Sequence, residues 1–264
     1  MTTAYTDRTK LRTGAYADER PLETRRAIYE YRRPRLDLVG EVVHRLRDIP
    51  AGVVADVGCG SGAYTKALRE RRSDLTVLAV DFSPGMVGHA GGPGFVADAM
   101  ALPLAEDSCS AVLALHMLYH VPDPAAAVAE FGRVLRPDGS CLIIGNGADD
   151  KIEFIRLWRQ ALRDVLGGDP EGDIFGSSIL RFGDMDALAR EVFPSVERVE
   201  YFGGTIVPDP APVIAFIDST RHLNDHPEFD AVRDRAAEIV TETVAREGAF
   251  TFTNHLGVIR GLPC

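Results

Sequence analysis

Residues 51–62 read AGVVADVGCGSG, a short apolar run that ends in an aspartate and three alternating glycines. The apolar residues of 53–57 fit a buried strand of a parallel sheet, where both faces are covered and strict alternation is not required. Residues 63–72, AYTKALRERR, fit a helix that buries its alanine and leucine positions. The stretch therefore predicts a strand, a glycine turn and a helix, in that order.

The three glycines, Gly58, Gly60 and Gly62, predict a nucleotide-binding turn. Glycine tolerates a positive φ and lets a ligand approach the backbone, and free N–H groups at a helix N-terminus attract electron-rich groups. The alternative is a glycine-rich turn that binds nothing. The spacing G-x-G-x-G differs from the dinucleotide pattern G-x-G-x-x-G, which argues against NAD. Asp56, two residues before the first glycine, can hold an ammonium group.

Two further acids follow the next predicted strands. Residues 75–80, LTVLAV, read as a second strand that ends at Asp81. An acid at the tip of the neighbouring strand can accept hydrogen bonds from both hydroxyls of a ribose, although a plain turn residue is the alternative. Residues 95–96 read as a short third strand that leads to Asp98 and Ala99, where a carboxylate can accept a hydrogen bond from an adenine amino group.

The glycine stretch resembles motif I of the class I S-adenosylmethionine (SAM)-dependent methyltransferases. Residues 95–124, FVADAMALPLAEDSCSAVLALHMLYHVPDP, resemble the type 11 (UbiE-like) subgroup, with an acid, a Leu-Pro loop, an apolar strand and a His-Val-Pro-Asp ending. Residues 131–144, FGRVLRPDGSCLII, resemble the helix, Arg-Pro-x-Gly turn and fifth strand of that subgroup. The resemblance covers residues 51 to about 146, with its elements in the family's order.

The resemblance implies an α/β fold, with a Rossmann-like, seven-stranded, mostly parallel sheet and helices on both of its faces. It also implies SAM as the cofactor and S-adenosylhomocysteine as the product. The cofactor-binding residues that we predict are Asp56, Gly58, Cys59, Gly60, Gly62, Asp81, Phe82, Met86, Asp98, Ala99 and His116.

The rest of the chain divides into additions to this fold. We expect residues 1–48 to form an N-terminal helical arm that acts as a lid, and residues 49–264 to form the SAM-binding domain. Within that domain, residues 205–248 are expected to form a helical cap inserted between strands six and seven. Phe154 and Trp158, on an amphipathic helix predicted over 152–166, and Phe216 either line an acceptor pocket or belong to a core.

Candidates for catalysis are fewer. His116 follows the fourth predicted strand at the carboxyl edge, where it can orient the cofactor or take a proton from the acceptor; a packed or solvated histidine is the alternative. Tyr16, in the N-terminal arm, is the second catalytic candidate. We predict no metal site, because His222 and His226 flank a stretch that Pro227 favours as a loop.

The charge composition limits which binding partners we expect. The chain has 264 residues, and 29 Lys and Arg against 39 Asp and Glu give a net charge of −10. This acidity argues against nucleic acid or an anionic membrane as the partner. We assign the one basic cluster to a solvated helix face; it comprises Arg25, Arg26, Arg32, Arg33 and Arg35.

The four cysteines are scattered without a C-x-x-C pair, which fits a reducing cytoplasm, and Cys59 and Cys141 resemble small buried residues. The N-terminus lacks an apolar signal region, and no apolar run approaches the ~18 residues that a membrane span needs. We therefore expect a cytoplasmic location.

The expected function is the transfer of a methyl group from SAM to a small-molecule acceptor, by a monomer or homodimer. Two alternatives stay open. One is a SAM-binding scaffold without methyl transfer, such as a cyclase or a binding module, because fold does not fix function. The other is a nucleic-acid methyltransferase.

Overall fold

The computed structural model describes residues 5–16, 19–168, 179–224 and 226–263. Cys264 and the first four residues of the predicted arm lie outside them. The chain divides into two compact units. The sheet unit comprises Asp37–Ala148, Leu180–Glu200 and Leu256–Cys264, and the helical unit comprises Met1–Leu36, Asp149–Ile179 and Tyr201–His255. The predicted boundary between an arm of residues 1–48 and a domain of residues 49–264 stays a prediction.

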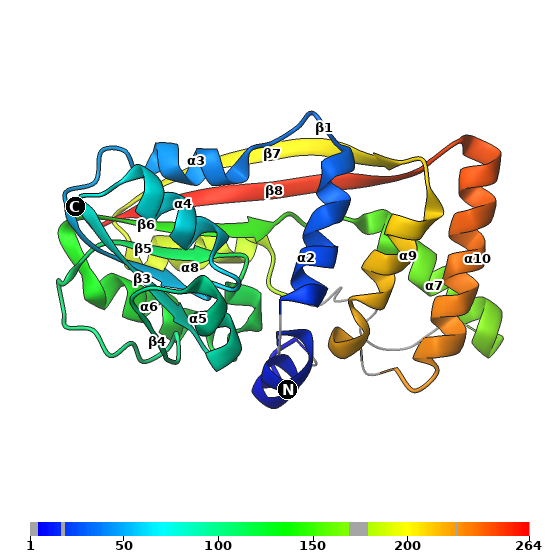
Figure 1. Ribbon diagram of the computed structural model, residues 1–264, viewed down its shortest axis with the longest axis horizontal. Coiled ribbons are helices and arrows are strands. Elements are labelled where there is room, and N and C mark those ends of the chain that lie inside the picture. Colours follow the sequence, from blue (N-terminus) through cyan, green and yellow to red (C-terminus); the bar gives the residue numbers. More distant parts are fainter. Residues whose placement is uncertain (1–4, 17–18, 169–178, 225, 264) are drawn as a thin grey trace. The chain divides into compact units, whose positions relative to one another are not determined.

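The sheet has the strand order β1-β7-β8-β6-β5-β2-β3-β4 (Figure 1). The five strands from β4 to β6 pair in parallel, and β8 pairs antiparallel with β6, so the sheet is mostly parallel as predicted. The seven strands of the predicted sheet are β2 Gly52–Val57, β3 Leu75–Asp81, β4 Gly94–Val96, β5 Cys109–Leu115, β6 Leu135–Asn146, β7 Ser195–Val207 and β8 Phe250–Leu262.

An eighth strand, β1 (Arg32–Arg33), corrects both the strand count and the basic cluster. It pairs antiparallel with Gly204 and Thr205 of β7. The side chain of Arg32 is only 5% exposed and donates hydrogen bonds to backbone carbonyls, including that of Pro34 at 3.3 Å. The assignment of Arg32 to a solvated helix face was therefore wrong, because the helical stretch ends before it.

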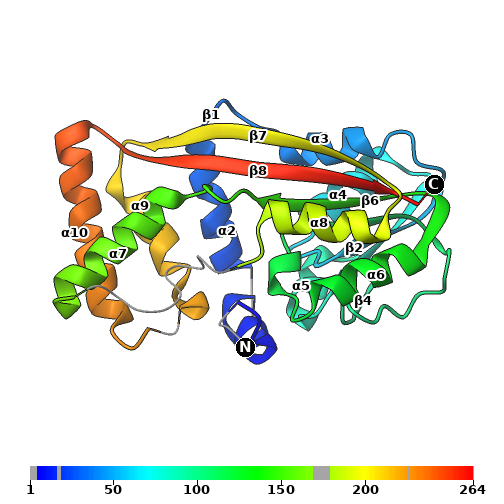
Figure 2. The same ribbon diagram turned by 180° about the vertical axis from the view of Figure 1, so that it is seen from behind.

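The helices of the sheet unit cover both faces of the sheet, as Figures 1 and 2 show. Alternate residues of the central strands, such as Val112 and Cys141, share one core with Phe131 of α6 and Met185 of α8. Helices α3 and α4 pack together on the opposite face. The helices of this unit are α3 Leu38–Arg45, α4 Ala63–Arg71, α5 Pro84–Ala90, the 3₁₀ turn η3 Leu118–His120, α6 Pro124–Val134 and α8 Phe182–Val192.

The helical unit has its own aromatic core. The ring of Phe154 lies 4.8 Å from that of Phe216, and Trp158 lies 5.2 Å from Phe229. Phe154, Trp158 and Phe216 are at most 4% exposed, so the core alternative is the one that the structure supports for all three. The elements are α1 Arg8–Lys10, η1 Leu11–Ala15, α2 Arg20–Ala27, η2 Ile28–Tyr31, α7 Ile152–Leu166, α9 Pro210–Asp218, η4 Arg221–Leu223 and α10 Phe229–Glu247.

Helices α9 and α10 lie between β7 and β8 in the chain, where the sequence predicts an insertion. Asp209 caps α9 by accepting a hydrogen bond from the N–H of Ala211, and Pro210 occupies the first helical position. In the parts of the chain that the structure describes, we find no helix with the length and hydrophobicity needed to span a bilayer.

Candidate active site

The glycine turn joins β2 to α4 and is shaped by packing within the chain. Gly58, Gly60 and Gly62 have φ values of 70°, 53° and 81°, which favour glycine. A Cβ at Gly58 would lie 2.5 Å from the Cβ of Met117, and a Cβ at Gly62 would lie 2.6 Å from the Cα of Ala90. The missing side chains of these two glycines make room for neighbouring segments, and the expectation that the glycines also leave room for a ligand stays a prediction.

Four N–H groups of this turn, which precede the first residue of α4, are engaged by hydrogen bonds within the chain. The N–H groups of Gly58 and Cys59 both donate to the carbonyl of Val80, at 2.7 and 3.0 Å. The N–H of Gly60 donates to Oδ2 of Asp81 at 3.0 Å, and the N–H of Gly62 donates to the carbonyl of Cys59 at 3.0 Å. Because these donors are engaged, the carboxylates of Asp56 and Asp81 dominate the electrostatics of the turn. Such a turn suits a ligand that donates from a cationic group or a hydroxyl better than it suits a phosphate.

Asp81 ends β3 beside this turn. Its Oδ1 accepts a hydrogen bond from the N–H of Ser83 at 2.8 Å, while its Oδ2 accepts the one from Gly60. Burial raises the pKa of the Asp81 carboxyl, and the backbone N–H donors around it act against that rise. Because a carboxylate oxygen has two lone pairs, each oxygen can still accept a hydroxyl hydrogen. Asp81 therefore fits the predicted ribose contact, which stays a prediction.

Asp56 is the next-to-last residue of β2, two residues before Gly58. Its side chain is 1% exposed, and Oδ2 accepts a short hydrogen bond from the hydroxyl of Thr65 in α4. Burial raises the pKa of Asp56 to about 6, and the hydrogen bond from Thr65 opposes that rise. No cationic partner lies within ion-pair distance of this carboxylate in the described parts of the chain, so an ammonium group would offset its burial.

The other predicted cofactor residues of the sheet unit lie along the same strand ends. Asp98 follows β4, and its Oδ1 accepts a hydrogen bond from the N–H of Met100 at 3.0 Å. The N–H of Ala97 donates to the carbonyl of Asp81 at 3.1 Å, which ties this segment to the end of β3. Phe82 is half-buried, and the predicted residues with the least exposure are Cys59 at 6%, Ala99 at 8% and Met86 at 0%.

His116 follows β5, at the same edge of the sheet. It adopts a left-handed backbone with φ of 59°, and its N–H donates to the carbonyl of Ile144 in β6 at 3.0 Å. A histidine in this conformation stores backbone strain, and such residues cluster at functional sites. The structure thus brings His116 to the edge where Asp56, Asp81 and Asp98 lie.

Tyr16, the second catalytic candidate, belongs to the helical unit. It packs with Leu11 and Leu223, and its ring lies 5.4 Å from the guanidinium carbon of Arg25. The second catalytic candidate therefore has a packing role in the structure, and its part in catalysis stays a prediction.

The sequence analysis did not identify three residues whose contacts shape the site. Thr65 contacts Asp56 across nine positions, and Met117 fills the space beside Gly58. Arg69, on α4, donates to the carbonyls of Val77 and Pro93, each at 2.7 Å, and so ties α4 to β3 and to the segment before β4. Of the three, only Thr65 could have been identified from the sequence, because it lies three residues before Leu68, on the side of the predicted helix that carries the alanine and leucine positions.

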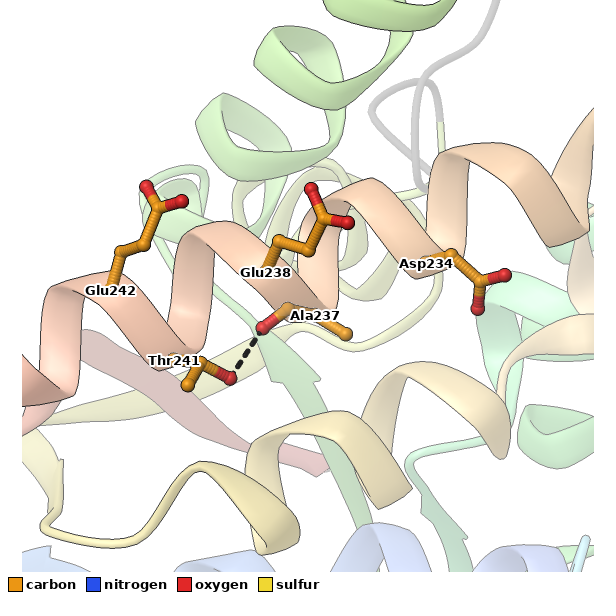
Figure 3. A pocket seen from close by; sticks show the side chains of 5 residues that line it. All are labelled: Asp234, Ala237, Glu238, Thr241 and Glu242. Carbon is orange, nitrogen blue, oxygen red and sulfur yellow. Dashed lines mark hydrogen bonds between the residues drawn. The ribbon is translucent and has the colours of Figure 1, made fainter.

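A depression on α10 is a separate feature (Figure 3). It has a volume of about 380 Å³ and is lined by Asp234, Ala237, Glu238, Thr241 and Glu242. Glu238 pairs with Arg235 of the same helix at 2.9 Å, and the hydroxyl of Thr241 donates to the carbonyl of Ala237 at 2.8 Å. None of the predicted site residues lines it, so it does not compete with the strand ends as the candidate active site.

Comparisons with known proteins identify the family of this chain. The family model described as a methyltransferase domain matches residues 55–143. An uncharacterized methyltransferase of Mycobacterium tuberculosis is 36% identical over 154 residues, which are 56% of this chain and 60% of the relative. The chain thus spans about 60% of the length of that relative. The demethylmenaquinone methyltransferase of Renibacterium salmoninarum is 33% identical over 202 residues, 67% of this chain and 84% of the relative.

Among solved structures, phosphoethanolamine N-methyltransferase 2 of Haemonchus contortus, in complex with phosphomonomethylethanolamine and S-adenosylhomocysteine, matches with a TM-score of 0.52. It is 14% identical, and the match covers 86% of this chain and 53% of that chain. This likeness concerns the fold. With the strand order, the glycine turn and the matched relatives taken together, the chain belongs to the class I methyltransferase family, in its type 11 subgroup.

Proposed function

We propose that this protein is a SAM-dependent methyltransferase that acts on a small-molecule acceptor and releases S-adenosylhomocysteine. The observation that carries the proposal is the pair of carboxylates beside the glycine turn, of which Asp56 is buried and Asp81 is half-buried. Asp56 lies at 1% exposure without a cationic partner at ion-pair distance in the described chain, and Asp81 keeps lone pairs for hydroxyl donors. SAM carries both an ammonium group and a ribose, which match these two carboxylates.

Bound SAM would supply a methyl group that its sulfonium already activates, so the chain's own residues mainly bind, orient and exclude water. In this proposal Asp56 and the turn of Gly58, Gly60 and Gly62 hold the amino-acid part. Asp81 accepts the ribose hydroxyls, and Asp98 with Ala99 reads the adenine. In the same proposal His116 acts at the reacting end of the site, where its imidazole would hold the cofactor or accept a proton from the acceptor.

Charge and relatives support a small acceptor. A net charge of −10 disfavours binding to polyphosphate partners, since such binding depends on clustered cations. The matched relative from Renibacterium salmoninarum acts, by its name, on demethylmenaquinone, a small molecule. We extend the proposal to a cytoplasmic enzyme that works as a monomer or homodimer, with residues 1–48 as a lid and residues 205–248 as a cap over the acceptor.

The test is turnover. The purified chain is incubated with methyl-labelled SAM and a panel of small phenols, amines and a demethylated naphthoquinone, and S-adenosylhomocysteine is quantified by mass spectrometry. We expect acceptor-dependent S-adenosylhomocysteine, and a matched Asp81→Ala variant should lose it. Binding of SAM without turnover on any acceptor would favour the scaffold alternative. Steeply salt-dependent binding to RNA or DNA would favour a nucleic-acid acceptor.

A further inference from the structure

The contact between Asp56 and Thr65 joins two elements across the glycine turn. Helix α4 begins after Gly62, which has no side chain to cap the helix. Thr65, the third residue of α4, donates its hydroxyl to the Asp56 carboxylate, and its backbone N–H favours the charged form of that carboxylate. Asp56 therefore lies beside the first turn of α4, at the positive end of the helix dipole.

Asp56 and Thr65 are both buried, and few other groups near them can stabilise the negative charge of Asp56. Asp56 is 1% exposed and Thr65 is fully buried. The ionisable groups that face Asp56 are Asp81 of β3, Cys59 of the turn and Arg69 of α4. Asp81 and Cys59 do not offset a negative charge, and the five hydrogen bonds that the Arg69 guanidinium makes go to backbone carbonyls.

After the burial itself, the Thr65 hydroxyl is the largest influence on the ionisation of Asp56, and it favours the charged form. Asp81 acts in the opposite direction, while the Thr65 N–H and Arg69 act in the same direction with less weight. The neighbouring cation, Lys66, donates instead to the carbonyl of Ser61 at 3.0 Å. Among the described residues, the Thr65 hydroxyl is therefore the side-chain donor that contacts the Asp56 carboxylate and favours its charged form.

We propose that Thr65 is a positioning residue that keeps Asp56 ionised and oriented toward the ammonium group of the cofactor, so that cofactor affinity at neutral pH depends on the Thr65 hydroxyl. The inference rests on the proposed function, because it assumes a ligand with an ammonium group. Thr65 itself is covered by protein, and it acts through Asp56.

The experiment measures the dissociation constant of S-adenosylhomocysteine by titration calorimetry between pH 5.5 and pH 8.5. Thr65→Val removes the hydroxyl at nearly constant volume, and Thr65→Ser restores it. Thr241→Val, which removes an exposed helical hydroxyl that donates to its own helix, is the matched control. Circular dichroism at pH 8.5 checks that each variant is folded.

We expect wild type and Thr65→Ser to lose affinity as the pH falls through about 6, where Asp56 takes up a proton. Losing a hydrogen bond to a charged group corresponds to about 1–2 pH units. Thr65→Val should therefore bind about 2-fold to 10-fold more weakly at pH 7 and approach wild type at pH 8.5. The carbon-13 resonance of the Asp56 carboxyl in the ligand-free protein should titrate at a higher pH in Thr65→Val.

An affinity loss that is equal at every pH, with an unshifted Asp56 titration, would mean that Thr65 serves packing alone and would overturn the inference. Failure of the wild-type protein to bind S-adenosylhomocysteine at pH 8.5 is a different result, because it would contradict the proposed function and not the role of Thr65. The two failures are distinguishable, since the carboxyl titration needs no ligand.

Discussion

Replacing Asp56 by asparagine should make the protein more stable while it weakens cofactor binding. The carboxyl is 1% exposed, and burial raises its pKa to about 6 from an ordinary value of 3.8. A difference of about 2 pH units corresponds to about 3 kcal/mol of folding free energy. The asparagine oxygen can still accept the hydrogen bond of the Thr65 hydroxyl, but its amide hydrogens need room, so we expect a net gain of about 1–3 kcal/mol.

The size of this stability gain depends on pH. Between about pH 4 and pH 6 the unfolded chain releases the Asp56 proton and the folded chain keeps it, so the stability of the wild type falls as the pH rises. Above that window Asp56 is ionised in both the folded and the unfolded chain, and the folded chain bears the full free-energy cost of the buried charge. The stability difference between Asp56→Asn and wild type should therefore be small at pH 4, grow to about pH 6.5 and stay constant above it.

The assay is urea unfolding followed by circular dichroism at a series of pH values. The matched control is Asp48→Asn, because Asp48 is an aspartate with a side chain 70% exposed, and it should change stability little at any pH. A destabilised Asp56→Asn variant at pH 8, or a difference that does not vary with pH, would refute the view that Asp56 is a costly buried charge retained for a ligand.

Asp81→Ala should weaken S-adenosylhomocysteine binding by about 1–3 kcal/mol, since it removes the acceptor of both ribose hydroxyls; unchanged affinity by calorimetry would reject that role. Gly58→Ala should destabilise the fold by more than about 2 kcal/mol in urea unfolding, because φ is 70° and Met117 fills the space. Gly167→Ala, with φ of 74° in the left-handed helical region and open space, should cost only about 1–2 kcal/mol, and an equal loss at both positions would contradict the packing argument. His116→Asn keeps a residue that tolerates the left-handed backbone, and it should lower kcat about 100-fold if His116 takes the acceptor proton, with cofactor affinity retained; an unchanged kcat and pH profile would exclude this role.

Local patterns were enough to predict the fold of the sheet unit. The apolar run before Gly58 and the helical spacing after Gly62 determine β2 and α4 without reference to distant segments. The helix predicted over 152–166 has those bounds in the structure, because an amphipathic period ends there at Gly167, whose φ of 74° closes the helix. Such features depend on residues that are close in sequence.

The details of the site depend on contacts between distant residues, and these were missed. The N–H groups of the glycine turn are engaged because the carbonyl of Val80 stands beside them, which follows from the pairing of β2 with β3. Arg32 is buried because a two-residue strand pairs with Thr205. The partnership of Asp56 with Thr65 needs the turn geometry itself. A charge pattern alone reveals none of these three.

The central claim is that the two carboxylates beside the glycine turn bind SAM. Calorimetric titration of the wild-type protein at pH 8 with S-adenosylhomocysteine, and separately with NADH, tests it most directly. The account predicts saturable binding of S-adenosylhomocysteine at one site per chain and no binding of NADH. Saturable binding of NADH, with no heat from S-adenosylhomocysteine or SAM, would contradict it.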